Sequence, residues 1–175
     1  MTESIHTASS ADDYADFAAL VTEYVDWSRT RYQENSWLID KVFGYQSLAS
    51  ELKTLSSTYG PPKGKTLLAS RDGHICGGGA YRQLADGSCE MKRLFVRREF
   101  GGAGTGRRLC NALIQSARDD GYTLMRLDTG TLLREAIAMY KSIGFKECAC
   151  YHQYPQELMP HLIFMELPLT GTWSN

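Results

Sequence analysis

The sequence contains no long apolar run. No stretch reaches the roughly 18 uninterrupted apolar residues by which a membrane-spanning helix is recognised. The first residues also lack the basic segment followed by an apolar segment that marks a secretory signal peptide. Neither sign of charge is in excess, because 19 Lys and Arg stand against 20 Asp and Glu, which gives a net charge of -1. We therefore expect a cytoplasmic protein with neither a membrane nor a nucleic acid as partner.

Cysteine motifs are missing as well. The five cysteines are Cys76, Cys89, Cys110, Cys148 and Cys150, and none of them forms a C-x-x-C pair or a spacing partnered by histidine. Zinc sites and disulfide frameworks depend on such spacings, so we expect no metal and interpret the thiols as reduced. Cys148 and Cys150 would share one face of a strand, where a metal or redox role is the weaker alternative.

Glycine, in contrast, is concentrated in one stretch. Residues 89–109 have the pattern of a strand, a turn and a helix, and the turn at 101–106 holds four glycines in six residues. Glycine allows positive φ and close approach of the backbone, and the first N–H groups of the following helix have no partners within it. These features predict an anion site, with a pyrophosphate as its expected occupant. The predicted contacts are Gly101, Gly102, Ala103, Gly104, Thr105, Gly106, Arg107 and Arg108.

Three kinds of glycine loop could explain this turn. The phosphate loop of nucleoside triphosphatases needs Lys and then Ser or Thr after its last glycine, but Arg107 and Arg108 stand there. The dinucleotide fingerprint needs G-x-G-x-x-G, which the sequence GGAGTG does not provide. The third kind binds coenzyme A: a strand ending in apolar-x-Val is followed by a short spacer and by Arg or Gln, x, x, Gly, x, Gly or Ala. It is matched by Leu94, Val96, Gly104 and Gly106.

A second motif follows about 30 residues later. The sequence AIAMYKSIGF is similar to the pattern A-x-x-L-Y-x-x-x-G-F, which it matches at Ala136, Met139, Tyr140, Gly144 and Phe145. On these two motifs, over about residues 12–167, the chain resembles the GNAT superfamily of N-acetyltransferases. It departs from that family where Gly101 replaces an Arg or Gln and Leu133 replaces a frequent Asn, and both changes remove contacts to the cofactor.

The resemblance implies an α/β (α+β) fold, with a mixed, mostly antiparallel central sheet, a splayed parallel pair of strands and flanking helices. One domain is expected over residues 1–175, with tails at 1–10 and 168–175. Periodicity and turn residues predict helices at about 12–33, 45–58, 104–120 and 135–143, and strands at about 65–71, 75–83, 91–96, 122–128, 146–151 and 162–167. The strand at 122–128 should run parallel to that at 91–96, because a full helix connects them.

The resemblance also implies the reaction. An acyltransferase of this family moves the acetyl group of acetyl-CoA to an amine by direct attack within a ternary complex. The pantetheine arm would lie between the two parallel strands and contact Leu94, Phe95 and Val96. The alternative is a non-catalytic domain that binds acyl-CoA for regulation. Homodimers are common in the family, so a homodimer is a further expectation.

Two residues carry the predicted chemistry. A general base must remove a proton from the ammonium, and Glu90 occupies the position where many family members have a glutamate in this role. A partly buried carboxylate there could have a raised pKa. The alternative for Glu90 is an ion pair with Lys92 or Arg93. Tyr140 is the predicted acid that protonates the leaving thiolate, and its alternative is a tyrosine that only packs on the inner face of its helix.

The acceptor site is predicted less directly. Trp37 and Phe43 could line its mouth or merely pack the first helices onto the sheet. Asp128, at the end of a strand, could bind coenzyme or substrate or cap the next helix. The segment around His152 and His161 could form the far wall. The identity of the acceptor amine is left open.

Overall fold

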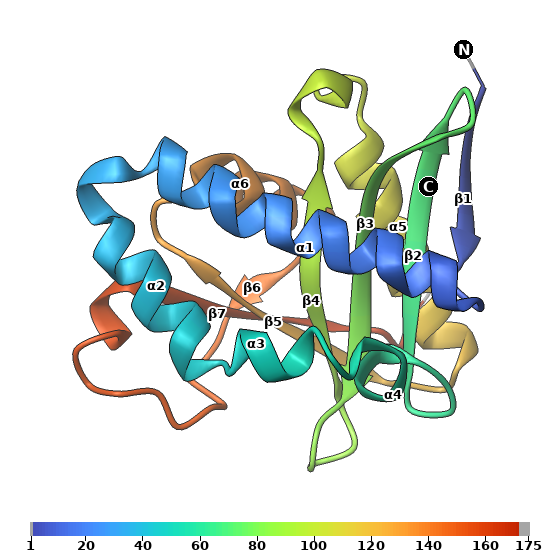
Figure 1. Cartoon of the computed structure of the whole chain (residues 1–175). Coiled ribbons are helices and arrows are strands. Elements are labelled where there is room, and N and C mark those ends of the chain that lie inside the picture. Colours follow the sequence, from blue (N-terminus) through green and yellow to red (C-terminus); the bar gives the residue numbers. More distant parts are fainter. Residues whose placement is uncertain (1, 172–175) are drawn as a thin grey trace.

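The protein is a seven-stranded sheet with helices on both faces (Figure 1). The computed structural model describes residues 2–171. The strands are β1 (Glu3–Thr7), β2 (Gly64–Arg71), β3 (His74–Gln83), β4 (Cys89–Val96), β5 (Leu124–Gly130), β6 (Lys146–Glu147) and β7 (Leu162–Pro168). Their order in the sheet is β1-β2-β3-β4-β5-β7-β6. Every neighbouring pair is antiparallel except β4 and β5, which are parallel. The predicted fold class is therefore confirmed.

The helices are α1 (Ala11–Arg31), α2 (Ser36–Tyr45), α3 (Leu48–Glu51), α4 (Leu55–Tyr59), α5 (Thr105–Asp119) and α6 (Arg134–Ile143), with the short 3₁₀ helices η1 (Gln33–Asn35), η2 (Arg98–Phe100) and η3 (Met159–His161). Helix α1 begins at a capping box, in which Ser10 accepts from the Asp13 N–H and the Asp13 carboxylate accepts from the Ser10 N–H. No helix within residues 2–171 has both the length and the apolar character that crossing a bilayer requires.

Two apolar clusters cover the two faces of the sheet. On one face, Phe17 and Leu20 of α1 pack with Tyr59 of α4 against Leu68 of β2. On the other face, the buried side of α5 packs against β2, β3 and β4, with Leu113 at its centre. Burial of these side chains removes apolar area from water, which is the main stabilising contribution to the fold. The sheet is thereby fixed from both sides, except where β4 and β5 part.

The prediction of a tail over residues 1–10 differs from the structure. Strand β1 pairs with β2 at the edge of the sheet, and its Glu3 carboxylate accepts a hydrogen bond from Arg71 Nη2 at 2.9 Å. At the other end, the Leu169 N–H donates to the Thr123 carbonyl at 2.8 Å and its side chain is buried. Residues 172–175 of the predicted C-terminal tail lie outside the described residues.

Two predicted elements are wrong. The single helix expected over 45–58 is instead two short helices, α3 and α4, which follow Ser47 with its φ of 55° and are separated by residues 52–54. Glu51 is drawn into the interior by an ion pair with Arg93, which helical periodicity cannot show. The strand expected over 146–151 pairs with β7 only at its first two residues. One more backbone bond, from the Cys148 N–H to the Phe164 carbonyl, follows, and farther on the Tyr151 hydroxyl donates to the buried Glu90 of β4.

Candidate active site

The site begins where β4 and β5 separate. The two strands pair in parallel only at Cys89–Met125 and Glu90–Arg126. Past these pairs β4 contains a bulge, because Ala80 of β3 opposes Lys92 whereas Gly78 already opposes Phe95. Arg93, inside the bulge, has the unusual φ of 59° for a residue with a side chain. The bulge bends β4 away from β5 and leaves backbone groups of both strands without strand partners.

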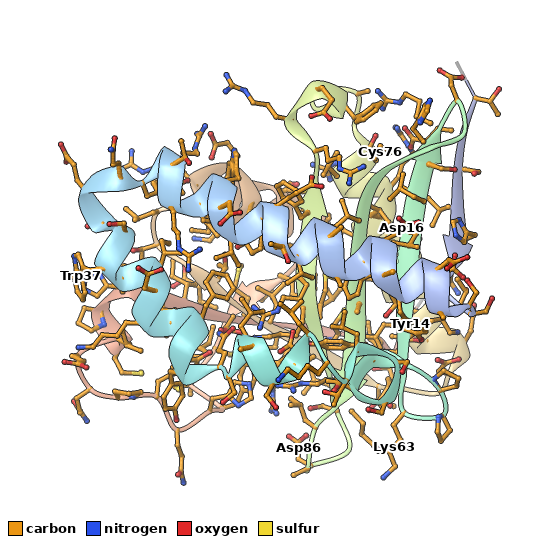
Figure 2. All side chains as sticks on the ribbon, viewed as in Figure 1. Tyr14, Asp16, Trp37, Lys63, Cys76 and Asp86 are labelled. Atoms are coloured by element: carbon orange, nitrogen blue, oxygen red, sulfur yellow. The ribbon has the colours of Figure 1, made fainter. Side chains whose placement is uncertain are left out.

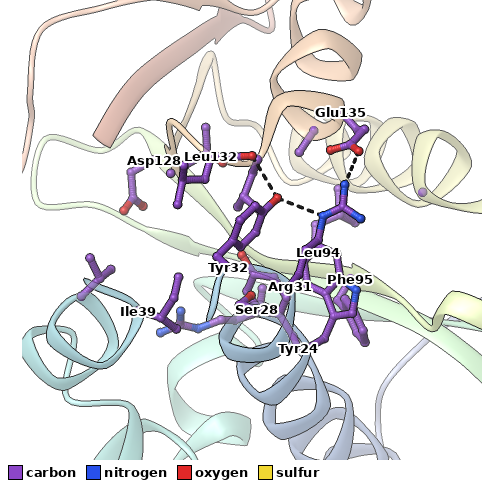
Figure 3. Close-up of a pocket in the computed structure, with 18 of the residues that line it drawn as sticks. Tyr24, Ser28, Arg31, Tyr32, Ile39, Leu94, Phe95, Asp128, Leu132 and Glu135 are labelled. Atoms are coloured by element: carbon purple, nitrogen blue, oxygen red, sulfur yellow. Dashed lines mark hydrogen bonds and ion pairs between the residues drawn. The ribbon is translucent and has the colours of Figure 1, made fainter. Parts of the chain in front are cut away.

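A cavity of about 890 Å³ occupies the gap between these strands (Figure 3). Its walls come from α1, α2, β4, the glycine turn, β5 and α6. A volume of this size is typical of sites that bind a small molecule or a cofactor. The predicted site residues that line it are Phe43, Leu94, Phe95, Val96, Gly101, Gly102, Gly106, Asp128 and Tyr140.

Polar contacts across the cavity tie α1 to the loop between β5 and α6. The Tyr32 hydroxyl donates to the Leu132 carbonyl at 2.9 Å, and Arg31 pairs with Glu135 at 2.5 Å (Figure 3). The sequence gives no signal for these contacts, because the pairs are about 100 residues apart. They fix the position of the helix that forms one wall.

The glycine turn has the backbone geometry of an anion site. Gly102 and Gly104 have φ values of 79° and 77°, which residues with a Cβ rarely adopt. Gly104 is the N-cap of α5, and no side chain caps the free N–H groups of the first turn. A Cβ on Gly106 would meet only Val96 and Met139, at 3.8 and 4.0 Å, so backbone is open to the cavity there. The helix dipole adds partial positive charge at the same end.

The other predicted residues of this turn brace it instead of lining the cavity. Arg108 pairs with Glu3 at 2.7 Å and donates to the Ala103 carbonyl at 2.8 Å. The buried Thr105 hydroxyl donates to the same Glu3 carboxylate at 2.8 Å, and Arg107 donates to Ser142 at 2.7 Å.

One cation that sequence reasoning missed lies on the cavity wall. Arg98, in η2, is exposed and lines the cavity beside Gly101. Gly101 is the position at which the family pattern expects Arg or Gln. The sequence does show a cation here, because Arg98 lies in the spacer between β4 and the glycine turn. The family pattern, however, has no position that assigns Arg98 to the cofactor.

Tyr140 lies in the wall of the cavity, on α6. Its side chain is buried and packs edge-on against Phe145, with ring centroids 5.7 Å apart. Burial raises the pKa of Tyr140 well above its usual value, and the neighbouring Cys110 contributes in the same direction. The phenol therefore stays protonated over the physiological range, as a proton donor must be. Tyr140 therefore packs on its helix, as one of the two alternatives had it, and also lines the cavity.

Glu90 lies elsewhere. Its side chain is fully buried and is not part of the cavity wall. Oε2 accepts two hydrogen bonds from Arg82 at 3.1 Å, and Oε1 accepts from Tyr151 at 3.0 Å and lies 2.6 Å from His152 Nε2. Burial alone would raise the pKa of Glu90, but Lys92, His152 and Arg82 together hold it well below its usual range. The expectation of a raised pKa is therefore wrong, and the predicted ion pair with Lys92 is present at 3.7 Å.

A second, polar pocket of about 150 Å³ adjoins the cavity. It is lined by Tyr45, Gln46, Glu51, Arg82, Lys92, Arg93, His152, Gln153 and Tyr154. Three of these residues, Gln46, Lys92 and Arg93, line the large cavity as well, so the two spaces meet beside the bulge of β4. Three of its residues, His152, Gln153 and Tyr154, belong to the segment that the sequence predicted as the far wall of the acceptor site.

Buried ion pairs lie where the two spaces meet. The Arg93 guanidinium binds Glu51 through Nε at 2.8 Å and Nη2 at 3.0 Å, and its Nη1 donates to Gln46 at 2.9 Å. Lys92 Nζ lies 2.7 Å from Asp128, which also accepts from the Tyr154 hydroxyl at 2.7 Å. Asp128 does not cap α6, whose first turn has no side-chain cap. Its role in this structure is to hold Lys92 and Tyr154.

The two aromatic residues predicted for the acceptor mouth differ. Phe43 is buried, lines the large cavity and lies under the Arg93 guanidinium, 5.1 Å from the ring centroid. Trp37 is 51% exposed and points away from the sheet at the outer edge of the molecule (Figure 2). It contacts the His161 ring at 5.8 Å and is absent from both pocket walls.

Comparisons with known proteins agree with this geometry. The model of the acetyltransferase (GNAT) family matches residues 22–145. An uncharacterized N-acetyltransferase of Schizosaccharomyces pombe is 35% identical over 173 residues, which cover 95% of either chain. A protein of Azospirillum brasilense named IAA acetyltransferase is 32% identical over 75% of this chain and 86% of its own.

Solved structures share the fold. A GNAT-family acetyltransferase of Staphylococcus aureus superposes with a TM-score of 0.73 at 16% identity, over 97% of this chain and 100% of that one. The PaiA N-acetyltransferase of Thermoplasma acidophilum gives a TM-score of 0.68 at 18% identity, over 96% and 99% of the two chains. The fold and the site thus define an acetyltransferase. The chain belongs to the GNAT family, as its two motifs predicted.

Proposed function

We propose that the protein transfers the acetyl group of acetyl-CoA to a primary amine by direct attack within a ternary complex. Coenzyme A lies along the large cavity, with its pyrophosphate at the glycine turn and its pantetheine arm between β4 and β5. Two neighbours of the same fold carry such a ligand: the Thermoplasma PaiA enzyme was solved with coenzyme A, and the Salmonella typhimurium YncA protein with its cofactor acetyl-CoA.

The observation that carries this proposal is the parting of two parallel strands above an uncapped helix N-terminus. Gly101, Gly102 and Gly106 line the same cavity as Lys92 and Tyr140. An extended amide-containing arm can pair with the free edge of β4 as another strand would. That pairing assigns Leu94 and Val96 to the pantetheine and leaves the thioester beside Tyr140.

Each chemical step then has a candidate group. Backbone N–H groups of β4 near the bulge stabilise the oxyanion of the tetrahedral intermediate. Tyr140 protonates the departing thiolate, which its place in the cavity wall supports. The role of Glu90 as a base stays a prediction, because this buried carboxylate meets the polar pocket only through its neighbours. Arg98 supplies the positive charge that an Arg at position 101 would give in the family pattern, where this chain has Gly101.

Homodimerisation, the cytoplasmic location and the lack of a nucleic-acid or membrane partner stay predictions of the sequence.

A charge placed in the glycine turn tests the donor site. In Gly106→Glu the new Cβ fits without a close contact, and both helix propensity and the helix dipole favour Glu at this position. The fold should persist, while the carboxylate repels a pyrophosphate. We expect acetyl-CoA affinity, measured by isothermal titration calorimetry, to fall at least about 100-fold.

Gly44→Glu is the matched control, because Gly44 also lies in a helix, has open space around it and lines neither pocket. It should bind acetyl-CoA like the wild type. An unchanged acetyl-CoA affinity in Gly106→Glu would contradict the assignment of the glycine turn as the pyrophosphate site. Release of coenzyme A thiol with a panel of primary amines then separates an enzyme from a domain that only binds acyl-CoA.

A further inference from the structure

The polar pocket contains one side chain that joins a buried carboxylate to an accessible space. His152 belongs to the segment between β6 and β7, and its side chain is 27% exposed where it lines the pocket. Its Nε2 lies 2.6 Å from Oε1 of the fully buried Glu90. The pocket has no assigned role in the reaction as described so far.

We propose that this pocket receives the acceptor amine and that His152 is the general base, oriented by Glu90 as its positioning residue. The inference rests on the acetyl transfer proposed above and names the residue that touches the acceptor. It assigns to Glu90 a role different from direct proton abstraction.

The contacts of Glu90 explain why the carboxylate does not act directly. Arg82 occupies Oε2 with two hydrogen bonds, while Tyr151 and His152 occupy Oε1. No part of the Glu90 side chain is exposed, so an amine cannot reach it. With its pKa held low, Glu90 remains an anion that accepts hydrogen bonds. Such a carboxylate can fix an imidazole and stabilise its protonated form.

The contacts of His152 leave one ring nitrogen for a substrate. Because an ionised Glu90 cannot donate, Nε2 carries the proton of that hydrogen bond and Nδ1 keeps its lone pair. The ring is held on its other sides by Tyr151 and Tyr154, whose centroids lie 4.6 and 5.9 Å away. The backbone is fixed where Cys150 Sγ donates to the His152 carbonyl. The imidazole is therefore pre-oriented before any ligand binds.

The position of the pocket suits an acceptor. It shares Gln46, Lys92 and Arg93 with the large cavity, so an amine in it lies next to the bulge of β4, where the thioester would be delivered. The cations around it are already neutralised, since Lys92 pairs with Asp128 and Arg93 with Glu51. A primary amine consequently meets polar groups without a strong excess of positive charge.

The protons balance in this scheme. The ammonium of the acceptor gives one proton to His152 Nδ1, and the free amine attacks the thioester carbon, so that the C–N bond forms and the carbonyl becomes an oxyanion. When the intermediate collapses the C–S bond breaks, and the thiolate takes a proton from Tyr140. The second proton of the nitrogen restores the Tyr140 phenol. His152 releases its proton to solvent, and the products are the amide and the coenzyme A thiol.

Replacement of His152 tests the assignment. In His152→Gln we expect kcat/KM for the best primary amine of the panel to fall about 100-fold or more, since a general base contributes on the order of 10²–10⁴. The remaining rate should rise with pH as the free amine becomes more abundant. The affinity for acetyl-CoA should not change. His74→Gln, an exposed hairpin residue, should behave like the wild type. For His152→Ala, added imidazole should restore part of the rate, which a purely structural residue would not permit.

A second variant separates the base from its positioning residue. The charged and titratable groups around His152 are Glu51, Arg82, Glu90, Lys92, Arg93, Tyr45, Cys150, Tyr151 and Tyr154. Only Glu90 among them bonds to the ring. In Glu90→Gln we expect a lower rate and an acid limb of the kcat/KM profile moved to lower pH, because the imidazolium loses its counter-charge. Nitrogen-15 NMR of the wild type should show a proton on Nε2 and none on Nδ1 above pH 8.

The outcomes are distinguishable. If His152→Gln keeps the turnover and the pH profile of the wild type, His152 is not the general base. The acetyl-transfer function is then unaffected. Loss of all activity in Glu90→Gln with full activity in His152→Gln overturns it in favour of Glu90. An Nδ1-protonated tautomer overturns it without any kinetic measurement. Retained acetyl-CoA binding without acetylation of any amine overturns the proposed function, and the base assignment fails with it.

Discussion

The two spaces that meet at the β4 bulge are built in opposite ways. The large cavity is lined mainly by apolar side chains and by backbone of the glycine turn and β4, with charged residues such as Arg98 and Asp128 among them, and no side chain caps the first turn of α5. The small pocket is bounded by charged side chains that pair with one another, from α3, β3, β4 and the segment before β7. The glycine turn of the large cavity therefore depends on the absence of side chains, and the small pocket depends on which distant residues meet. Substitutions should accordingly have different effects in the two regions.

The largest expected effect concerns chemistry on the cavity side. Tyr140→Phe keeps the ring packing against Phe145 but removes the proton donor. We expect kcat to fall on the order of 100-fold or more, with acetyl-CoA affinity unchanged. Tyr122→Phe is the control, because that hydroxyl donates to the Lys63 carbonyl outside both pockets. Equal turnover in Tyr140→Phe and Tyr122→Phe would reduce Tyr140 to a packing residue.

The next effect concerns stability on the polar side. In Glu51→Ala the buried Arg93 loses both hydrogen bonds to the carboxylate and remains an uncompensated charge. Loss of one partner from a buried pair costs about 3–5 kcal/mol in the free energy of unfolding, which urea denaturation measures. The control is Glu135→Ala, which removes an exposed pair with Arg31 and should cost about 1 kcal/mol or less. Similar losses in the two variants would mean that the buried pair is not what holds the bulge.

The smallest effect is acid sensitivity beneath the glycine turn. Arg71 lowers the pKa of Glu3 to about 2; burial opposes this shift, and Arg108 and Thr105 add to it. A folded pKa below the unfolded one, near 4.3, means that the stabilisation is complete above about pH 5 and is lost as pH falls toward 2. Glu3→Gln should therefore be less stable than the wild type near pH 7, by about 1 kcal/mol.

Thermal unfolding across this pH range measures the difference. It should disappear near pH 2. A constant difference between Glu3→Gln and wild type from pH 7 to pH 2 would contradict the assigned contacts.

Much of the cavity side could be predicted from the sequence. Positive φ at 102 and 104 requires glycine at both positions. The turn, α5 and the motif of α6 follow one another closely along the chain, so short sequence patterns are enough to recognise each of them. The parallel relation of β4 and β5 also followed, because a helix joins them. Tyr140, the last motif residue assigned a role, lines the cavity, and its role as an acid stays a prediction.

The polar side could not be predicted in this way. The broken helix after α2, the short β6 and the burial of Glu90 all depend on side chains that meet across 40 to 60 residues, as in the pairs Glu51–Arg93 and Glu90–His152. Periodicity reports which face of an element is apolar, and a charged residue in such a pattern is assigned to solvent. The two alternatives for Trp37 could not be separated for the same reason, since an aromatic side chain on a helix can face either way, and Trp37 is 51% exposed.

The sequence by itself determined the family, the fold class and the place of the glycine turn between β4 and α5, because glycine positions and hydrophobic spacing act through local backbone geometry. Only the tertiary structure decided which charges are buried together and what surrounds Glu90 and His152. The free energy of a charge depends on partners and on distance from water, and in this chain both are set by segments that approach one another only after folding.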